Sequence, residues 1–178
     1  MGDLLFEFTE WIRSTFMVDW ALAITEWPLS EWIVTNFWAI PIFQVSHILA
    51  MSAAFGAVLM MSLRIWGVAG GSYTVPDAAR RYIPWMWWGL LALVLSGLLM
   101  IVGEPIRELI NPIFWIKMGL VVALVLLSIA YNSRVTKRAT SHGPEWVASG
   151  GQRAGAFGLV ILWMVIMAGG RWIAYAPV

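Results

Sequence analysis

Polar side chains stand inside stretches of sequence that are otherwise long and apolar enough to cross a membrane. The segment FQVSHILAM, residues 43–51, carries Gln44 and His47 three residues apart, so both side chains share one face of a helix. An imidazole can ligate a metal, donate a hydrogen bond or accept one. Because ionisable residues are costly in lipid, a histidine in such a helix indicates a functional site.

Other apolar stretches bring charged groups to a similar depth. At a rise of 1.5 Å per residue, His47, Lys117 and Arg171 lie roughly 9–13 Å inside the ends of their helices. Glu104 closes a further apolar stretch on the same side. We therefore expect one polar pocket near one face of the membrane. Its residues would be Gln44, His47, Glu104, Lys117, Arg171 and Trp172.

Each pocket residue has an expected role. His47 would be an axial ligand or a hydrogen-bond donor, while Lys117 and Arg171 would bind the anionic part of a ligand. Glu104 would orient His47 or Arg171. A structural interpretation stands beside this one, since lysine and arginine reach headgroups and histidine can bond across a bundle.

Three ligands suit these residue types. Haem b would use His47 with a thioether from Met118 or Met167, because the other histidine, His142, lies in a loop on the opposite side. A quinone would use His47 as donor and Trp172 as a wall. Copper would use His47 with Met51, four residues later on the same face, since imidazole and thioether suit Cu(I). Further sulfur could come from Met60, Met61, Met164 and Met167.

Four stretches have the length of a membrane-spanning helix, which takes about 20 residues. The chain is 61% hydrophobic and 12% charged, whereas a soluble domain is roughly one quarter charged. The spans are expected at 37–66, 82–103, 112–132 and 154–176. The sequence thus predicts an all-α integral membrane four-helix bundle over residues 37–176, surrounded by the lipid bilayer.

Residues 1–36 form a different kind of segment. Apolar residues recur there at helical spacing and acidic residues take the other face, as in Leu4, Phe8, Trp11 and Ile12 against Asp3, Glu7 and Glu10. This pattern predicts an amphipathic helix in the membrane interface. A docking platform for a partner subunit is the alternative interpretation.

Lysine and arginine set the expected orientation. Most of them lie in the loops between the first and second spans and between the third and fourth. By the positive-inside tendency these loops are cytoplasmic, which places both termini on the periplasmic side of a bacterial inner membrane. Net charge is only +1, without a basic run, so we expect no nucleic-acid partner.

Two classes of chemistry are excluded by what the sequence lacks. There is no cysteine, so thiolate metal sites, iron–sulfur clusters and Cys-linked haem do not apply. The nucleophile-elbow, zinc-protease and P-loop motifs are also absent from the sequence. We do not expect an enzyme that acts on its own.

Several motifs together resemble a known family. They are His47 in the first span, Pro84-Trp85 in the second, the N-P-x-F-x-x-K stretch from Asn111 to Lys117, and Gly170-Arg171-Trp172 near the end. Over roughly residues 35–176 the chain is similar to small bacterial four-helix membrane proteins grouped as a domain of unknown function. The resemblance implies an inner-membrane bundle and no particular activity.

More distantly, the first span is similar to those of copper-resistance D-type proteins and cytochrome b561-like bundles. The chain departs from the b561 pattern because it lacks paired histidines in the membrane, and Tyr131 stands where another histidine would be sought. The leading hypothesis is a membrane subunit of a redox system with a haem or quinone pocket near the outer face. The alternatives are an accessory or assembly subunit of a larger complex, or a copper-handling protein. Protein partners or a homo-oligomer are expected in each case.

Overall fold

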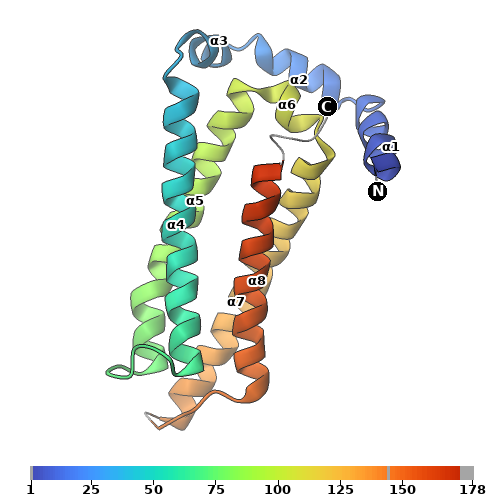
Figure 1. The fold of residues 1–178 in the computed structure, drawn as a ribbon. Helices are drawn as coiled ribbons and strands as arrows, with labels where there is room; N and C mark the ends of the chain where they lie inside the picture. Colours follow the sequence, from blue (N-terminus) through green and yellow to red (C-terminus); the bar gives the residue numbers. More distant parts are fainter. Residues whose placement is uncertain (1, 144, 173–178) are drawn as a thin grey trace. The chain divides into compact units, whose positions relative to one another are not determined.

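The structure, a computed structural model, describes residues 2–143 and 145–172 (Figure 1). These residues form α-helices joined by short connections, with no strand among them. In chain order the helices are α1 (Gly2–Arg13), α2 (Met17–Thr25), α3 (Pro28–Thr35), α4 (Ala39–Trp66), α5 (Val75–Gly103), α6 (Pro105–Leu109), α7 (Pro112–His142) and α8 (Gly150–Trp172).

Four of the helices are long and apolar enough to cross a membrane, namely α4, α5, α7 and α8. Many of their large apolar side chains are exposed on the protein surface, where lipid would be the favourable neighbour. The chain is therefore a small polytopic membrane protein. The prediction of an all-α protein of the four-helix membrane type is confirmed.

Three of the long helices extend beyond the predicted spans, whereas α4 lies within its own span of 37–66. α5 begins at Val75 where the span was expected from 82, and α7 continues to His142 where it was expected to end at 132. α8 begins at Gly150 and its described part ends at Trp172, so residues 173–176 of the predicted span lie outside the described residues. A helix ends where its terminal backbone groups find capping partners, and this point need not coincide with the end of the apolar stretch. Hydropathy therefore predicted only the central part of each of these helices.

The start of α5 shows such a cap. The backbone N–H of Thr74 donates to the Asp77 carboxylate at 3.2 Å, and the N–H of Asp77 donates back to the Thr74 hydroxyl at 3.4 Å. This reciprocal pair is a capping box. Arg80, one turn further on, forms an ion pair with Asp77. The first turns of α5 are therefore polar, although the helix is continuous with its apolar span.

The N-terminal segment forms three short helices where one amphipathic helix was expected. α1 ends where the hydroxyls of Ser14 and Thr15 donate to the carbonyls of Trp11 and Ile12, at 2.7 and 2.6 Å. These side chains compete with the next turn of helix for its carbonyl acceptors. α3 then begins with Pro28 in its first turn, a position that proline favours.

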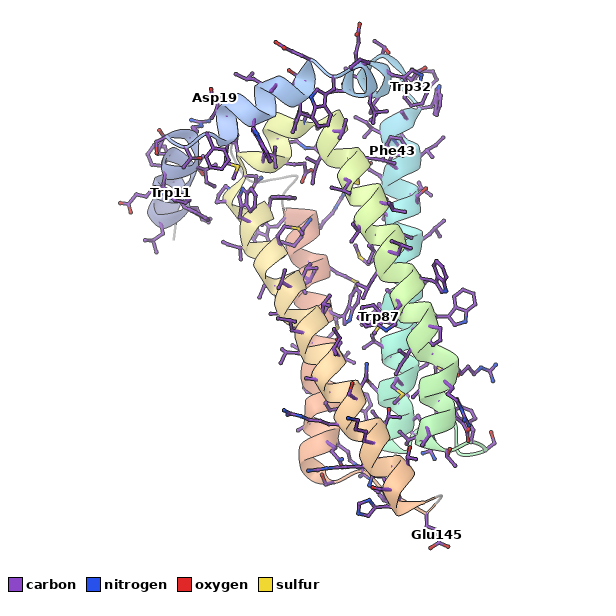
Figure 2. All side chains as sticks on the ribbon, turned by 180° about the vertical axis from the view of Figure 1, so that it is seen from behind. Trp11, Asp19, Trp32, Phe43, Trp87 and Glu145 are labelled. Atoms are coloured by element: carbon purple, nitrogen blue, oxygen red, sulfur yellow. The ribbon has the colours of Figure 1, made fainter. Side chains whose placement is uncertain are left out.

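Aromatic side chains remain exposed on these short helices. Trp11 of α1 and Trp32 of α3, both labelled in Figure 2, are 62% and 45% exposed. Ile12, next to Trp11, is almost fully buried. α1 therefore has a buried face as well as an outward aromatic face, and tryptophan is the side chain typical of the membrane–water interface.

The chain divides into two compact units. Unit 1 comprises Met1–Leu49, Ala92–Gly119 and Met167–Val178, and unit 2 comprises Ala50–Leu91 and Leu120–Ile166. Each of the four long helices contributes one end to unit 1 and the remainder to unit 2.

Unit 1 is held together partly by the packing of α2 on α6 (Figure 1). Ala21 of α2, Leu109 of α6 and Phe114 of α7 form the buried cluster between these helices. The Trp115 indole donates a hydrogen bond to the carbonyl of Leu109 at 2.8 Å, which joins the start of α7 to the end of α6. The N-terminal segment is therefore packed on the long helices of this unit.

Unit 2 contains close helix contacts made by small residues. A methyl group at Gly89 of α5 would come within 2.8 Å of the Ala54 Cβ and 2.9 Å of the Ala54 backbone nitrogen. Ala54 is fully buried, and it belongs to a stretch rich in small residues, 51–58, of the kind that lets membrane helices approach closely. Tyr131 of α7 donates from its hydroxyl to the carbonyl of Gln152 on α8 at 2.5 Å.

Candidate functional site

The predicted site residues lie in the same compact unit. Four helices and the α5–α6 junction bring them to unit 1, and none belongs to unit 2. They are Gln44, His47, Glu104, Lys117, Met118, Met167, Arg171 and Trp172.

His47 is the member of this set with a hydrogen bond across helices. Its ring nitrogen Nδ1 lies 2.9 Å from the Ser96 hydroxyl, which joins α4 to α5. A Cβ built on the adjacent Gly97 would lie 3.5 Å from His47 Cε1 and 3.9 Å from Nδ1, at ordinary van der Waals distance. The Nδ1 edge of the half-buried ring therefore contacts α5 at Ser96 and Gly97.

The hydrogen bonds of Ser96 assign the proton in this contact. Its hydroxyl lies 2.6 Å from the carbonyl oxygen of Ala92, one turn earlier on α5. Two oxygens at that distance need a proton between them, and a hydroxyl has only one. Ser96 therefore donates to Ala92 and accepts from His47, so Nδ1 carries the proton.

The second ring nitrogen of His47 is left as an acceptor. A neutral imidazole protonated at Nδ1 presents a lone pair at Nε2. No side chain or carbonyl among residues 2–143 and 145–172 makes a hydrogen bond to Nε2. The sequence had led us to expect a metal ligand or a hydrogen-bond donor at this position. With Nδ1 engaged by Ser96, the free Nε2 can serve as a metal ligand or as a hydrogen-bond acceptor, and it does not donate.

Lys117 lies in the same unit. Its ammonium stands over the Phe114 ring, 5.5 Å from the ring centroid, and its charge interacts electrostatically with Glu108 and His47. The aliphatic chain runs close to Gly170 of α8, where a Cβ would lie 3.8 Å from Lys117 Cδ. Within the described part of the chain no carboxylate comes into ion-pair distance of its ammonium. A ligand oxygen could therefore be its partner.

Glu104 has a different partner from those expected. Its carboxylate forms an ion pair with Arg107 at 2.5 Å, and Arg107 also reaches Glu108 at 3.4 Å. No hydrogen bond joins Glu104 to His47 among the described residues. Glu104 directly precedes α6 and lies about one helical turn before Arg107, so these charges stabilise the α5–α6 corner.

Sequence reasoning missed Glu108, which is only 6% exposed. Its position in the stretch Glu104-Pro-Ile-Arg-Glu was the available signal, because Pro105 suits a first helical turn and Arg107 follows Glu104 by three residues. A five-residue helix is too short for its buried face to be recognised from periodicity.

The remaining predicted residues lie at the margin of the unit. Gln44 is exposed one turn before His47, and Arg171 and Trp172 are exposed at the end of α8. Met118 packs against the cluster of Ala21, Leu109 and Phe114, as a gap-filling thioether does. Met167 is half-buried.

The donor sets for metals are small. No group of three or more His, Cys, Asp or Glu side chains that could hold a metal ion occurs in the described ranges. A copper or haem iron at His47 would thus be completed by methionine or by a second molecule. His47 itself would suit such a metal, because Nδ1 donates to Ser96 and Nε2 remains available as a ligand. The described residues supply no comparable second ligand.

A second group of polar side chains, which sequence reasoning also missed, lines a cavity in unit 2. The cavity measures about 10 Å³ and its polar lining residues are Ser62, Tyr82, Ser128, Tyr131 and Asn132. That volume suits about one water molecule. These residues carry no charge at neutral pH, so a search of the spans for ionisable groups passes over them.

Comparisons of the chain with protein-family models, with curated proteins and with solved structures find no match.

Proposed function

We propose that this protein is a membrane subunit of an electron-transfer system that binds the ring of a quinone at His47 in unit 1. The observation that carries the proposal is the fixed imidazole. Ser96 holds Nδ1 at 2.9 Å, and Nε2 is left without a hydrogen-bond partner in the described chain. An orientated histidine and a lysine whose charge it senses are suitable groups for the two oxygens of a quinone ring.

A quinone needs less from the chain than a haem does. Its ring oxygens require hydrogen-bonding groups, which His47 and Lys117 supply from α4 and α7. A six-coordinate haem requires a second axial ligand, and unit 1 holds no other histidine among its described residues. Of the two methionines predicted as thioether ligands, Met118 already packs against the apolar cluster, which leaves Met167. We therefore favour a quinone over haem b as the ligand.

The cellular setting is part of this proposal. We place the chain in a bacterial inner membrane, with the loops that follow α4 and α7 in the cytoplasm. The lysines and arginines concentrated in and near those loops support this orientation. The His47 site would then open toward the outer face, where a periplasmic or membrane-bound partner could exchange electrons with the bound quinone.

Quinone binding tests the proposal. The protein is purified in detergent, its bound lipids are extracted and assayed for quinone, and a short-chain benzoquinone is titrated back by calorimetry. We expect saturable binding that His47→Ala weakens at least tenfold. Ser46→Ala is the matched control, because Ser46 is exposed on the same turn of α4. Equal binding by the wild type and His47→Ala would contradict the proposal, and reduced haem bands in the absorption spectrum would replace quinone with haem.

An accessory subunit is the second candidate, favoured by a specific observation. Arg107 satisfies both acidic groups of the α5–α6 corner, so those charges have a structural role. The exposed tryptophans of α1 to α3 would suit a partner as well as a lipid surface. Stable co-purification with other membrane subunits, unchanged by His47→Ala, would favour this candidate.

A further inference from the structure

We propose that the His47 site prefers the reduced form of its ligand, so that it binds a quinol more tightly than the corresponding quinone. This inference rests on the proposed function and adds the redox state of the ligand. It follows from the hydrogen bonds of two residues, His47 and Ser96.

The Ser96 hydroxyl has one proton for its two contacts, with the Ala92 carbonyl and with His47. Ser96 is buried, and its single hydroxyl proton is used by the Ala92 carbonyl at 2.6 Å. This bond to the preceding turn is a common arrangement for serine in helices. Ser96 can therefore only accept at the 2.9 Å contact with His47, which fixes the proton of a neutral imidazole on Nδ1.

The free Nε2 nitrogen of His47 determines which form of the ligand is recognised. Nε2 presents a lone pair, so it forms a hydrogen bond only with a ligand group that carries a proton. A quinol hydroxyl carries that proton. A quinone carbonyl carries no proton, so its oxygen lone pair would meet the lone pair of Nε2 and no hydrogen bond would form. One hydrogen bond gained by one form and lost by the other corresponds to roughly a tenfold difference in dissociation constant.

Lys117 does not reverse the preference for the quinol. Its ammonium donates hydrogen bonds and accepts none. It can bind a quinone carbonyl, and it can equally bind a quinol oxygen through its lone pair. Lys117 therefore favours neither form strongly, and the discrimination lies at Nε2 of His47.

Ser96 is thus a positioning residue whose removal has a distinctive effect. In Ser96→Ala the acceptor at Nδ1 is gone, so the imidazole is free to carry its proton on Nε2 and donate it to a quinone carbonyl. The affinity for the quinone should rise relative to that for the quinol. A purely structural role for Ser96 would weaken both forms alike.

The test compares two forms of one ligand. Decyl-benzoquinone and its quinol are titrated by calorimetry, under argon and at about pH 8, where an ordinary imidazole is neutral. The variants are wild type, Ser96→Ala, Ser96→Thr, which keeps a hydroxyl, and Ser46→Ala as control. We expect the wild type and Ser46→Ala to bind the quinol about tenfold more tightly. Ser96→Ala should reduce this ratio to about threefold or less, and Ser96→Thr should restore it.

The outcomes separate this inference from the proposed function. Binding of both forms with equal affinity, or of the quinone more tightly, in the wild type overturns the inference and leaves a quinone site at His47. An unchanged ratio in a folded Ser96→Ala variant also overturns it. If that variant does not fold, the ratio of the quinone and quinol dissociation constants of the wild type still decides whether the inference holds. If neither form binds to the wild type, both the inference and the proposed function fail.

Discussion

The Nδ1 nitrogen of His47 and the hydroxyl of Ser96 lie 2.9 Å apart and join two membrane-spanning helices within one compact unit. The same hydroxyl gives its proton to Ala92, so the histidine is held in one tautomer by the helix that it packs against. Orientation of a functional imidazole through its second nitrogen is the general way in which proteins prepare a ligand site.

A double-mutant cycle should detect the His47–Ser96 bond. Hydrogen bonds between membrane helices contribute about 0.6 kcal/mol on average. We therefore expect a coupling free energy of unfolding of about that size between His47→Ala and Ser96→Ala, measured by denaturant or thermal unfolding in detergent. The control pair, His47→Ala with Ser46→Ala, should show no coupling. Zero coupling for His47 and Ser96 would mean that the contact does not stabilise the fold.

Gly89→Ala should destabilise unit 2. The added methyl would come within 2.9 Å of the backbone nitrogen of Ala54, and a backbone cannot move aside as a flexible side chain can. Overpacking of this kind costs about 1–3 kcal/mol. The thermal midpoint in detergent measures it. Gly158→Ala is the matched control, because nothing lies within 4 Å of its added methyl, and it should leave the midpoint unchanged or raise it. Equal midpoints for the two variants would contradict the close contact.

Tyr73 predicts a dependence of stability on alkaline pH. Its hydroxyl lies 3.0 Å from that of Tyr82, and this hydrogen bond, with smaller contributions from its surroundings, raises the pKa of Tyr73 above its usual range. The folded protein then holds the proton more tightly than the unfolded chain does. The stabilisation is complete below the ordinary tyrosine pKa of about 10 and is lost as the pH rises through the raised value.

The measurement for Tyr73 is a phenolate absorbance titration together with thermal midpoints at increasing pH. Tyr82→Phe should return the titration of Tyr73 toward its usual range and flatten the decline of stability above about pH 10. Tyr73→Phe removes the same titration and is the control. A decline in stability that is the same in all three proteins would have another origin.

Membrane orientation can be read with single cysteines, because the chain has none of its own. Ser14 and Ser141 are both exposed, the first after α1 and the second at the end of α7. In intact spheroplasts a membrane-impermeant maleimide should label Ser14→Cys and not Ser141→Cys. Labelling of both should follow lysis. The reverse pattern in intact cells would invert the proposed orientation and place the His47 site toward the cytoplasm.

Much of the fold could be predicted from the sequence because lipid imposes simple rules. Long apolar stretches predict α4, α5, α7 and α8, and charged groups such as Lys117 are conspicuous within them. Those rules do not specify how helices are paired and rotated. The contact between Ser96 and His47 depends on the register of α5 against α4, so it could not be predicted from the sequence.

The short elements were harder for a different reason. α6 has five residues, fewer than two helical turns, so its buried Glu108 leaves no periodic pattern. The break between α1 and α2 depends on hydroxyl bonds of Ser14 and Thr15 to nearby carbonyls. Competition of this kind between a hydroxyl and the next turn of helix is not visible in hydropathy.

Nitrogen-15 NMR of the imidazole rings tests the central claim most directly, since the chain has only two histidines. The spectrum is recorded at about pH 8 with and without decyl-benzoquinol, and His142→Gln assigns the signals. The account predicts that His47 is protonated on Nδ1, that its Nε2 signal shifts when the quinol binds, and that His142 does not respond. A His47 ring protonated on Nε2, or one that is unaffected by the ligand, would contradict it.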